Sequence, residues 1–257
     1  MTIHPSAIVD PKARLAPGVS IGAYSVVGPG VEVGEDTWIG AHVVLDGRTR
    51  IGKGNRIFHF ASIGAPPQDK KYSGEETLVE IGDGNTIREY VTINRGTALD
   101  AGATRLGDDN WIMAYVHFAH DCQVGSHTIV ANACQLAGHV KLGDWAILGA
   151  TTLVHQFVSI GAHAFTGMGT YLAQDLPPYV TAAGNPAKPY GLNAEGLRRR
   201  GFTPEAMAAL KTAYRTLYRS SLPLEEARRQ LAEQAKASVE VAALVRFLSD
   251  ARRGLLR

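Results

Sequence analysis

The sequence is poor in cysteine, since Cys122 and Cys134 are the only two among its 257 residues. So few cysteines exclude a disulfide-rich secreted scaffold, and we expect both to be buried free thiols. Residues 1–10 hold no basic segment followed by an apolar one, so the sequence predicts no signal peptide and a cytoplasmic protein. No run of about 18 apolar residues occurs, so we also expect no membrane span.

The chain also has little excess charge, with a formal net charge of +2. Nucleic-acid-binding domains usually show a stronger basic excess, so we expect no nucleic-acid partner. The charge is uneven: residues 191–257 hold thirteen Lys and Arg against seven Asp and Glu, whereas residues 1–190 hold thirteen against seventeen. This asymmetry favours an acidic partner or a phosphate-bearing ligand at the C-terminal end.

What the sequence does contain is a six-residue period. Aliphatic residues occupy every sixth position from Ile3 to Ile63, then positions 81, 87 and 93, and again every sixth position from Leu106 to Ile160. Of these twenty-four positions only Phe118 is aromatic, and twelve are followed by glycine. This period is typical of a parallel β-helix in which three hexads close a turn and turns stack about 4.8 Å apart. We expect the glycines to allow tight corners, through a positive φ or a close backbone approach.

Two loops interrupt the period, and a helical region follows it. Residues 65–80 keep the six-residue phase but are polar and rich in turn formers, and residues 98–105 shift the phase by seven. Beyond residue 190 the pattern becomes helical, with helices expected at 193–200, from Thr203 to about Ser220, opening at 222–226, and at 239–248. We therefore expect a β-helix over residues 1–190 and an α-helical C-terminal domain over residues 191–257.

An ordered set of segments resembles the UDP-N-acetylglucosamine O-acyltransferases of lipid A biosynthesis, a hexapeptide-repeat family. The matching segments cover nearly the whole chain: 60–64, 68–72, 89–97, 117–122, 136–140, 154–157, 173–180 and 193–202. The resemblance implies a left-handed β-helix and a homotrimer with active sites between subunits. It also implies transfer of a (R)-3-hydroxyacyl group from acyl carrier protein to the glucosamine 3-hydroxyl of UDP-N-acetylglucosamine.

The resemblance assigns roles to particular residues. His120 would be the general base, a role that suits an imidazole with a pKa near ~6.5. Asp121 would orient and charge-stabilise it, and Gly138 would offer a backbone N–H to the thioester oxyanion. The other matching positions would bind substrate: Gln68, Asp69, Lys71, His117, His139, His155, Gln156, Asn193, Glu195, Arg199 and Arg200.

Met168 matches a position that limits acyl-chain length in this family. A methionine there predicts a chain of about ten carbons in a close-packed slot, where glycine would admit about fourteen. No metal or redox cofactor is expected, because the donor brings its own phosphopantetheine. Lys211, Arg215 and Arg219 share one helix face by their spacing of four, and we expect them to meet the acidic carrier protein.

Several alternatives stay open at this point. The acceptor is either a 3-hydroxyl or a 3-amino sugar. Zinc carbonic anhydrases share the repeat but carry a His-x4-His pair, whereas this chain has His117 and His120. The later N-acyltransferase of the same pathway has an additional N-terminal uridine-binding domain, for which repeats beginning at Ile3 leave no room. Two further alternatives are a coenzyme A-dependent acetyltransferase and a non-catalytic scaffold.

Overall fold

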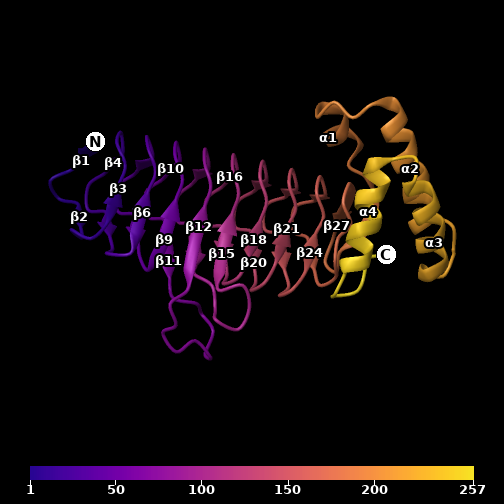
Figure 1. Cartoon of the computed structure of the whole chain (residues 1–257). Coiled ribbons are helices and arrows are strands. Elements are labelled where there is room, and N and C mark those ends of the chain that lie inside the picture. Colours follow the sequence, from indigo (N-terminus) through magenta and orange to yellow (C-terminus); the bar gives the residue numbers. More distant parts are fainter.

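The computed structural model describes residues 1–257. Twenty-eight short strands coil into a triangular prism, and four helices follow at its C-terminal end (Figure 1). Sheet A contains β1 (Thr2–Ile3), β4 (Ser20–Ile21), β7 (Trp38–Ile39), β10 (Arg56–Ile57), β13 (Thr86–Ile87), β16 (Trp111–Ile112), β19 (Ile129–Val130), β22 (Ile147–Leu148), β25 (Phe165–Thr166), β27 (Val180–Ala183) and β28 (Lys188–Leu192). Sheet B contains β2 (Ile8–Val9), β5 (Val26–Val27), β8 (Val44–Leu45), β11 (Ser62–Ala65), β14 (Thr92–Asn94), β17 (His117–Phe118), β20 (Gln135–Leu136), β23 (Leu153–Val154) and β26 (Tyr171–Leu172). Sheet C contains β3 (Arg14–Leu15), β6 (Val31–Val33), β9 (Arg48–Ile51), β12 (Leu78–Ile81), β15 (Ala103–Leu106), β18 (Gln123–Val124), β21 (Lys141–Leu142) and β24 (Ser159–Ile160).

The register of the coil follows the six-residue period. Ile3 pairs with Ile21, so parallel neighbours are one turn of three hexads apart. From Ile21 onwards the periodic aliphatic side chains point inward and join a single core cluster of 40 buried residues, in which Phe118 is also fully buried, whereas Ile3 in the first turn is exposed. Each such side chain contributes about 1.5–3 kcal/mol of burial free energy. Because no turn has a core of its own, stacking of turns stabilises the prism.

Most of the glycines that follow the periodic aliphatic residues allow close approach, whereas Gly64 has a positive φ of 87°. At Gly34 a Cβ atom would lie 2.5 Å from the carbonyl carbon of Gly52 in the next turn, a distance that no side chain tolerates. At most corners the left-handed backbone conformation falls three positions after the periodic residue, on non-glycine residues such as Asp36 (φ 55°), Asp121 (φ 59°) and His139 (φ 65°). The structure therefore confirms both roles expected for the glycines, close approach at Gly34 and a positive φ at Gly64.

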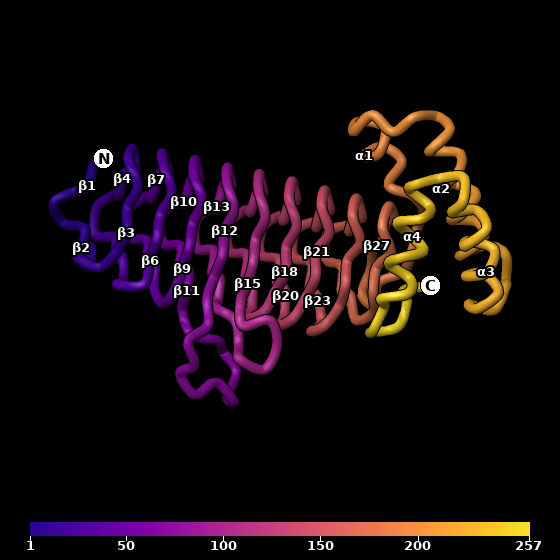
Figure 2. Tube along the Cα trace, viewed as in Figure 1, coloured from indigo at the N-terminus to yellow at the C-terminus, as the bar shows by residue number.

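Both interruptions leave the coil as loops on one side of the prism (Figures 1 and 2). Across the first loop the paired residues Asn55 and Asn85 are 30 positions apart, and across the second Asn85 and Asn110 are 25 apart, against 18 in a regular turn. The first loop therefore adds two hexads and preserves the phase, whereas the second adds the seven residues seen as a phase shift in the sequence.

The helices are α1 (Ala194–Arg199), α2 (Pro204–Tyr218), α3 (Leu224–Ala235) and α4 (Val239–Asp250). Asn193, Thr203 and Ser238 cap α1, α2 and α4 through their side-chain oxygens. The C-terminal segment then returns to the coil, where the buried carboxylate of Asp175 accepts the backbone N–H groups of Arg252 and Arg253. None of the helices is both long and apolar enough to cross a membrane.

Candidate active site

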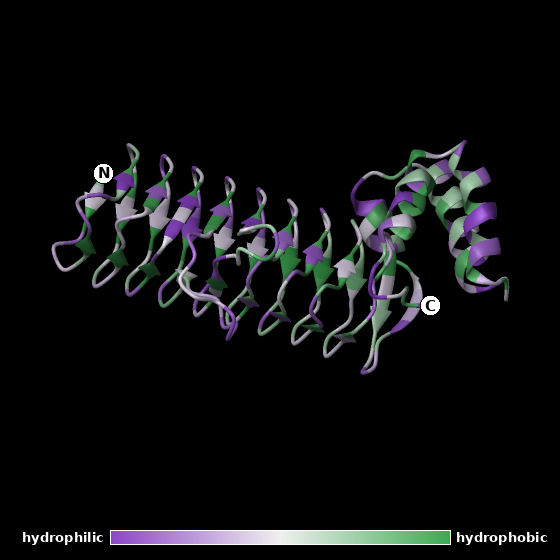
Figure 3. Ribbon diagram, turned by 60° about the horizontal axis from the view of Figure 1, so that its bottom comes forward, coloured by the Kyte–Doolittle hydropathy of each residue, from purple (hydrophilic) through white to green (hydrophobic).

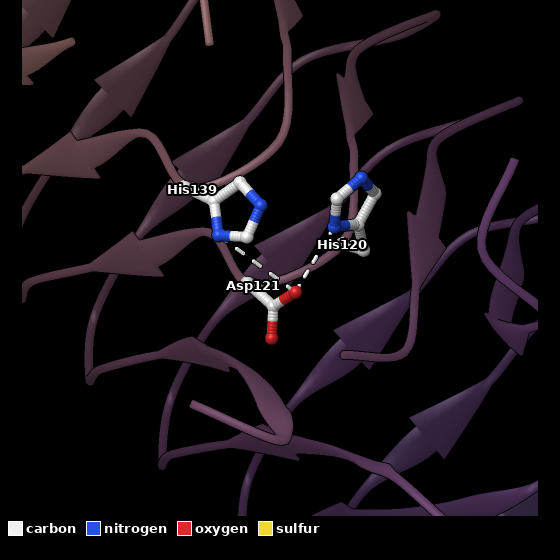
Figure 4. Close-up of side chains that lie close together, drawn as sticks. All are labelled: His120, Asp121 and His139. Atoms are coloured by element: carbon white, nitrogen blue, oxygen red, sulfur yellow. Dashed lines mark hydrogen bonds and ion pairs between the residues drawn. The ribbon is translucent and has the colours of Figure 1, made fainter. Parts of the chain in front are cut away.

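The expected base and its carboxylate meet at the corner between sheets B and C, directly after β17. Nδ1 of His120 lies 3.0 Å from Oδ2 of Asp121 (Figure 4). Asp121 is only 1% exposed, and it also accepts the backbone N–H of Thr97 and, at 2.7 Å, the Thr97 hydroxyl. Burial alone would raise the pKa of Asp121, but the hydrogen bonds from His120 and Thr97 outweigh it and hold the pKa below the usual value. A charged carboxylate therefore orients His120.

Gly138 lies against the ring of His120 from the next turn. A Cβ atom at Gly138 would lie 2.7 Å from Nε2 of His120, so only glycine permits this contact. The N–H groups on either side of Gly138 are engaged, since Ala137 donates to the Val154 carbonyl and His139 to the His120 carbonyl. The Gly138 N–H itself makes no hydrogen bond within the chain. A free backbone donor beside a base is the arrangement that stabilises an oxyanion.

A groove of about 370 Å³ runs past these groups over sheet B. His117, His155 and Gln68 join His120 and Gly138 in its wall. Nδ1 of His117 lies 2.7 Å from the Thr92 hydroxyl, and burial, reinforced by nearby His120, lowers the pKa of His117. The structure thus gathers residues from both the polar loop and three successive turns around one groove.

His139 follows Gly138 of this groove and packs against the ring of His120. Its ring stacks on Phe157 with centroids 4.2 Å apart and meets the His120 ring edge-on at 4.9 Å. Its Nδ1 lies 2.5 Å from Oδ2 of Asp100 and 3.9 Å from Oδ2 of Asp121. On its other side opens a second hollow of about 440 Å³, which Asp100 and Phe157 also line.

His120, Asp121 and His139 are the only group with metal-ligand character, their ligand-type atoms lying within 4.8 Å of one another. Hydrogen bonds already engage these atoms, because Asp121 Oδ2 faces His120 and Thr97 while His139 Nδ1 faces Asp100. The arrangement is that of an acid–base network.

The four expected ligands after residue 190 lie away from this groove. Asn193 accepts from the Gly196 N–H and donates to the His163 carbonyl, and Glu195 pairs with Arg199 at 2.8 Å. Arg200 lies over the Trp145 ring at 5.2 Å. Trp145 belongs to the corner between sheets C and A, a different edge of the prism from His120. Within one chain these residues contact His163 but do not meet the histidines of the groove, His117, His120 and His155.

The remaining expected residues have few contacts in the single chain. Asp69 Oδ1 accepts the backbone N–H of Lys71 at 3.0 Å, while the side chains of Lys71 and Gln156 are exposed. Met168 is 78% exposed at the corner after β25. The sequence analysis missed Thr97 and Asp100, which contact Asp121 and His139. Thr97 ends a family-like segment, a signal that could have found it, whereas nothing in the sequence marks Asp100.

Two family models match the chain. A hexapeptide model, "Bacterial transferase hexapeptide (six repeats)", matches residues 1–35 and 103–138. The model described as "Udp N-acetylglucosamine O-acyltransferase; Domain 2" matches residues 175–256. An acyl-[acyl-carrier-protein]–UDP-N-acetylglucosamine O-acyltransferase of Herminiimonas arsenicoxydans is 57% identical over 259 residues, covering 99% of each chain. The chain belongs to this acyltransferase family.

Relatives and solved structures agree on the family. The enzyme of the same name from Thiobacillus denitrificans is 57% identical over 256 residues, covering 100% of this chain and 99% of its own. A crystal structure of UDP-N-acetylglucosamine O-acyltransferase from Moraxella catarrhalis superposes with a TM-score of 0.98 at 44% identity, covering 100% of both chains. The left-handed β-helix followed by a short helical part, expected from the sequence, is confirmed for this acyltransferase.

Proposed function

We propose that this acyltransferase moves a (R)-3-hydroxyacyl group from acyl carrier protein to the glucosamine 3-hydroxyl of UDP-N-acetylglucosamine, the first step of lipid A biosynthesis. The observation that carries the proposal is the buried Asp121–His120 pair beside the unpaired N–H of Gly138. It supplies the base and the oxyanion donor that acyl transfer from a thioester requires.

The proton path that we propose runs through the ring of His120. His120 donates its Nδ1–H to Asp121, which leaves Nε2 free to take the proton of the sugar hydroxyl. The hydroxyl oxygen then bonds to the thioester carbon, and the carbonyl oxygen takes negative charge that the Gly138 N–H stabilises by about 3 kcal/mol. When the C–S bond breaks, His120 returns the proton to the departing phosphopantetheine thiolate. No metal or redox cofactor enters this sequence, since the phosphopantetheine arrives on the carrier protein.

A homotrimer with active sites between subunits would unite the two separated groups of substrate residues. Exposed apolar side chains mark two faces: Trp38 and Trp111 on sheet A, and Ile8, Val26 and Val44 on sheet B. In Figure 3 one row of strands near the N-terminus is green, whereas other strands there are purple or pale. A ladder of stacked rings follows the corner between these sheets: Tyr24, His42, Phe60, Tyr90 and Tyr115.

Sheet C differs from the other two faces because a row of ion-paired side chains covers it. Basic and acidic residues alternate along this row: Arg14, Glu32, Arg50, Glu80 and Arg105. A charged face suits water, whereas apolar faces A and B suit contact with other copies. If face A of one copy packs on face B of the next, the corner that holds Arg200 meets the corner that holds His120. Sedimentation should therefore give a trimer; a monodisperse active monomer would contradict this arrangement.

One assay tests the activity. Purified protein is incubated with UDP-N-acetylglucosamine and a ladder of (R)-3-hydroxyacyl carrier proteins, and the acylated nucleotide sugar is identified by mass spectrometry. We expect a base-labile 3-O-ester with the best rate near ten carbons, about the length that Met168 would permit. A parallel reaction with the 3-amino sugar distinguishes the two acceptors. Faster turnover of the amino sugar, or no turnover of either, would overturn the proposed function.

A further inference from the structure

The loop that shifts the repeat, residues 97–102, contacts the active-site corner in two successive turns. We call it the clamp loop. Thr97, at its start, holds the carboxylate of Asp121 through both its N–H and its hydroxyl. Asp100, near its tip, reaches His139, which lies 39 positions further along the chain. The clamp loop therefore supplies a partner to each of the two neighbouring corner residues.

The contact between Asp100 and His139 constrains one ring nitrogen. Phe157 stacks almost parallel to the His139 ring, at 5°, and the His120 ring meets it at 89°, so rotation of His139 is restricted on two sides. The His139 side chain is 14% exposed, whereas that of Asp100 is 51% exposed. Since Asp100 keeps part of its hydration, it can stay charged and accept the Nδ1–H of His139 at 2.5 Å.

We propose that Asp100 is a positioning residue of the acyl-transfer site, which holds the His139 proton on Nδ1 and leaves Nε2 as an acceptor for a hydroxyl of the sugar. This inference rests on the proposed function for the identity of the substrate. The proposal also uses the orientation of the His139 ring, whose Nε2 points away from Asp121 in Figure 4. The Asp100 carboxylate thus fixes the tautomer and orientation of His139, as the Asp121 carboxylate does for His120.

Other charged groups face His139 and must be considered in any test. Asp121 Oδ2 lies 3.9 Å from Nδ1, and the His120 ring lies edge-on to it. Lys141, Asp250 and Arg252 line the adjoining hollow with Asp100. Asp100 is the closest of the carboxylates, so its removal should change the tautomer even though Asp121 remains.

The first measurement is the ¹⁵N chemical shift of the imidazole nitrogens, which reports the tautomer without substrate. In the trimer as purified, His139 should carry its proton on Nδ1, with the assignment taken from the signals lost in His139→Gln. Asp100→Ala should transfer a large part of the population to the Nε2–H form that a free histidine side chain prefers. An unchanged Nδ1–H tautomer in Asp100→Ala would overturn the proposal.

The second measurement is steady-state kinetics with the nucleotide sugar and a hydroxyacyl carrier protein. Asp100→Ala should lower kcat/KM by about ten-fold, in line with loss of one hydrogen bond to a charged group. Asp100→Asn should lose less, because its amide oxygen still accepts. The matched control is Glu233→Ala, which removes an exposed carboxylate from its partner Lys236, 2.6 Å away on α3, and should leave kcat/KM unchanged.

A double variant separates positioning from general damage to the clamp loop. Asp100→Ala combined with His139→Gln should be no slower than His139→Gln alone, because Asp100 acts only through His139. Losses that multiply would overturn the proposal. If the wild-type protein turns over no acceptor sugar, the proposed function fails, whereas the tautomer measurement still decides the role of Asp100.

Discussion

Asp121 hydrogen-bonds to the side chain of the residue that precedes it, His120, with 3.0 Å between Oδ2 and Nδ1. Consecutive residues of a strand point to opposite faces, so such neighbours rarely meet. They meet here because Asp121 adopts the left-handed conformation, with φ 59°, at a corner of the coil. The corner that turns the chain from sheet B to sheet C therefore also builds the His120–Asp121 pair.

Removal of the base is the most direct prediction. His120→Ala should reduce kcat by at least about 10²-fold, the lower end of what a general base contributes, while sedimentation and circular dichroism show the same assembly state and fold as the wild type. His4→Ala is a matched control, because His4 is exposed in the first turn of the coil and its ring hydrogen-bonds only to Ser6. Should His120→Ala keep most of the wild-type activity, another residue must act as the base.

The acyl-chain length should depend on Met168. Met168→Gly removes about four heavy atoms from the slot, so the preferred chain should lengthen by roughly four methylenes. Each misfit methylene costs ~1–3 kcal/mol, which makes the change visible as a new optimum across the donor ladder. The same optimum in both proteins would show that Met168, exposed in the single chain, does not border the acyl chain.

The basic face of α2 should contribute to recognition of the carrier protein. Lys211, Arg215 and Arg219 line a hollow of about 640 Å³ beside α1. Reversing these three charges to Glu should raise the KM for the hydroxyacyl carrier protein and leave the KM for the nucleotide sugar unchanged, because only the protein donor is strongly acidic.

The matched control for the basic face is a charge reversal on α3. Arg229 and Lys236 pair with acidic residues of their own helix, so reversing them changes the total charge without touching the hollow. An equal rise in both KM values after reversal of Lys211, Arg215 and Arg219 would place these residues at the sugar site instead.

Stability should fall in mild acid because of His163. Burial, reinforced by the positive charge of Arg200, lowers the pKa of His163 to about 4. The unfolded chain, with a histidine pKa near ~6.5, then binds more protons than the folded one across this window, so the free energy of unfolding decreases as the pH falls from about 6.5 towards about 4. In His163→Gln this part of the pH dependence should disappear from urea-unfolding curves; parallel curves for the two proteins would contradict it.

The sequence predicted most of the coil because its rule is local and repetitive. An inward aliphatic residue every six positions determines both the register, as in Ile3 with Ile21, and the core. The sequence also predicted the helices that begin after Thr203 and at residue 239. In the structure the side chains of Thr203 and Ser238 cap these two helices. The site was harder to predict: family-like motifs named His120, Asp121 and Gly138, but not their partners.

The sequence by itself determined the stacking of turns, the seven-residue phase shift and the amphipathic helices, because each depends on spacing along the chain. Only the tertiary structure decided where the phase-shifting loop goes. Its path places Thr97 on Asp121, 24 residues away, and Asp100 on His139, 39 residues away. Such contacts depend on how a non-repeating segment folds against turns that form later in the chain, and no local pattern specifies that. The same holds for Arg200, whose place on a different edge from His120 follows from the number of turns and corners between them.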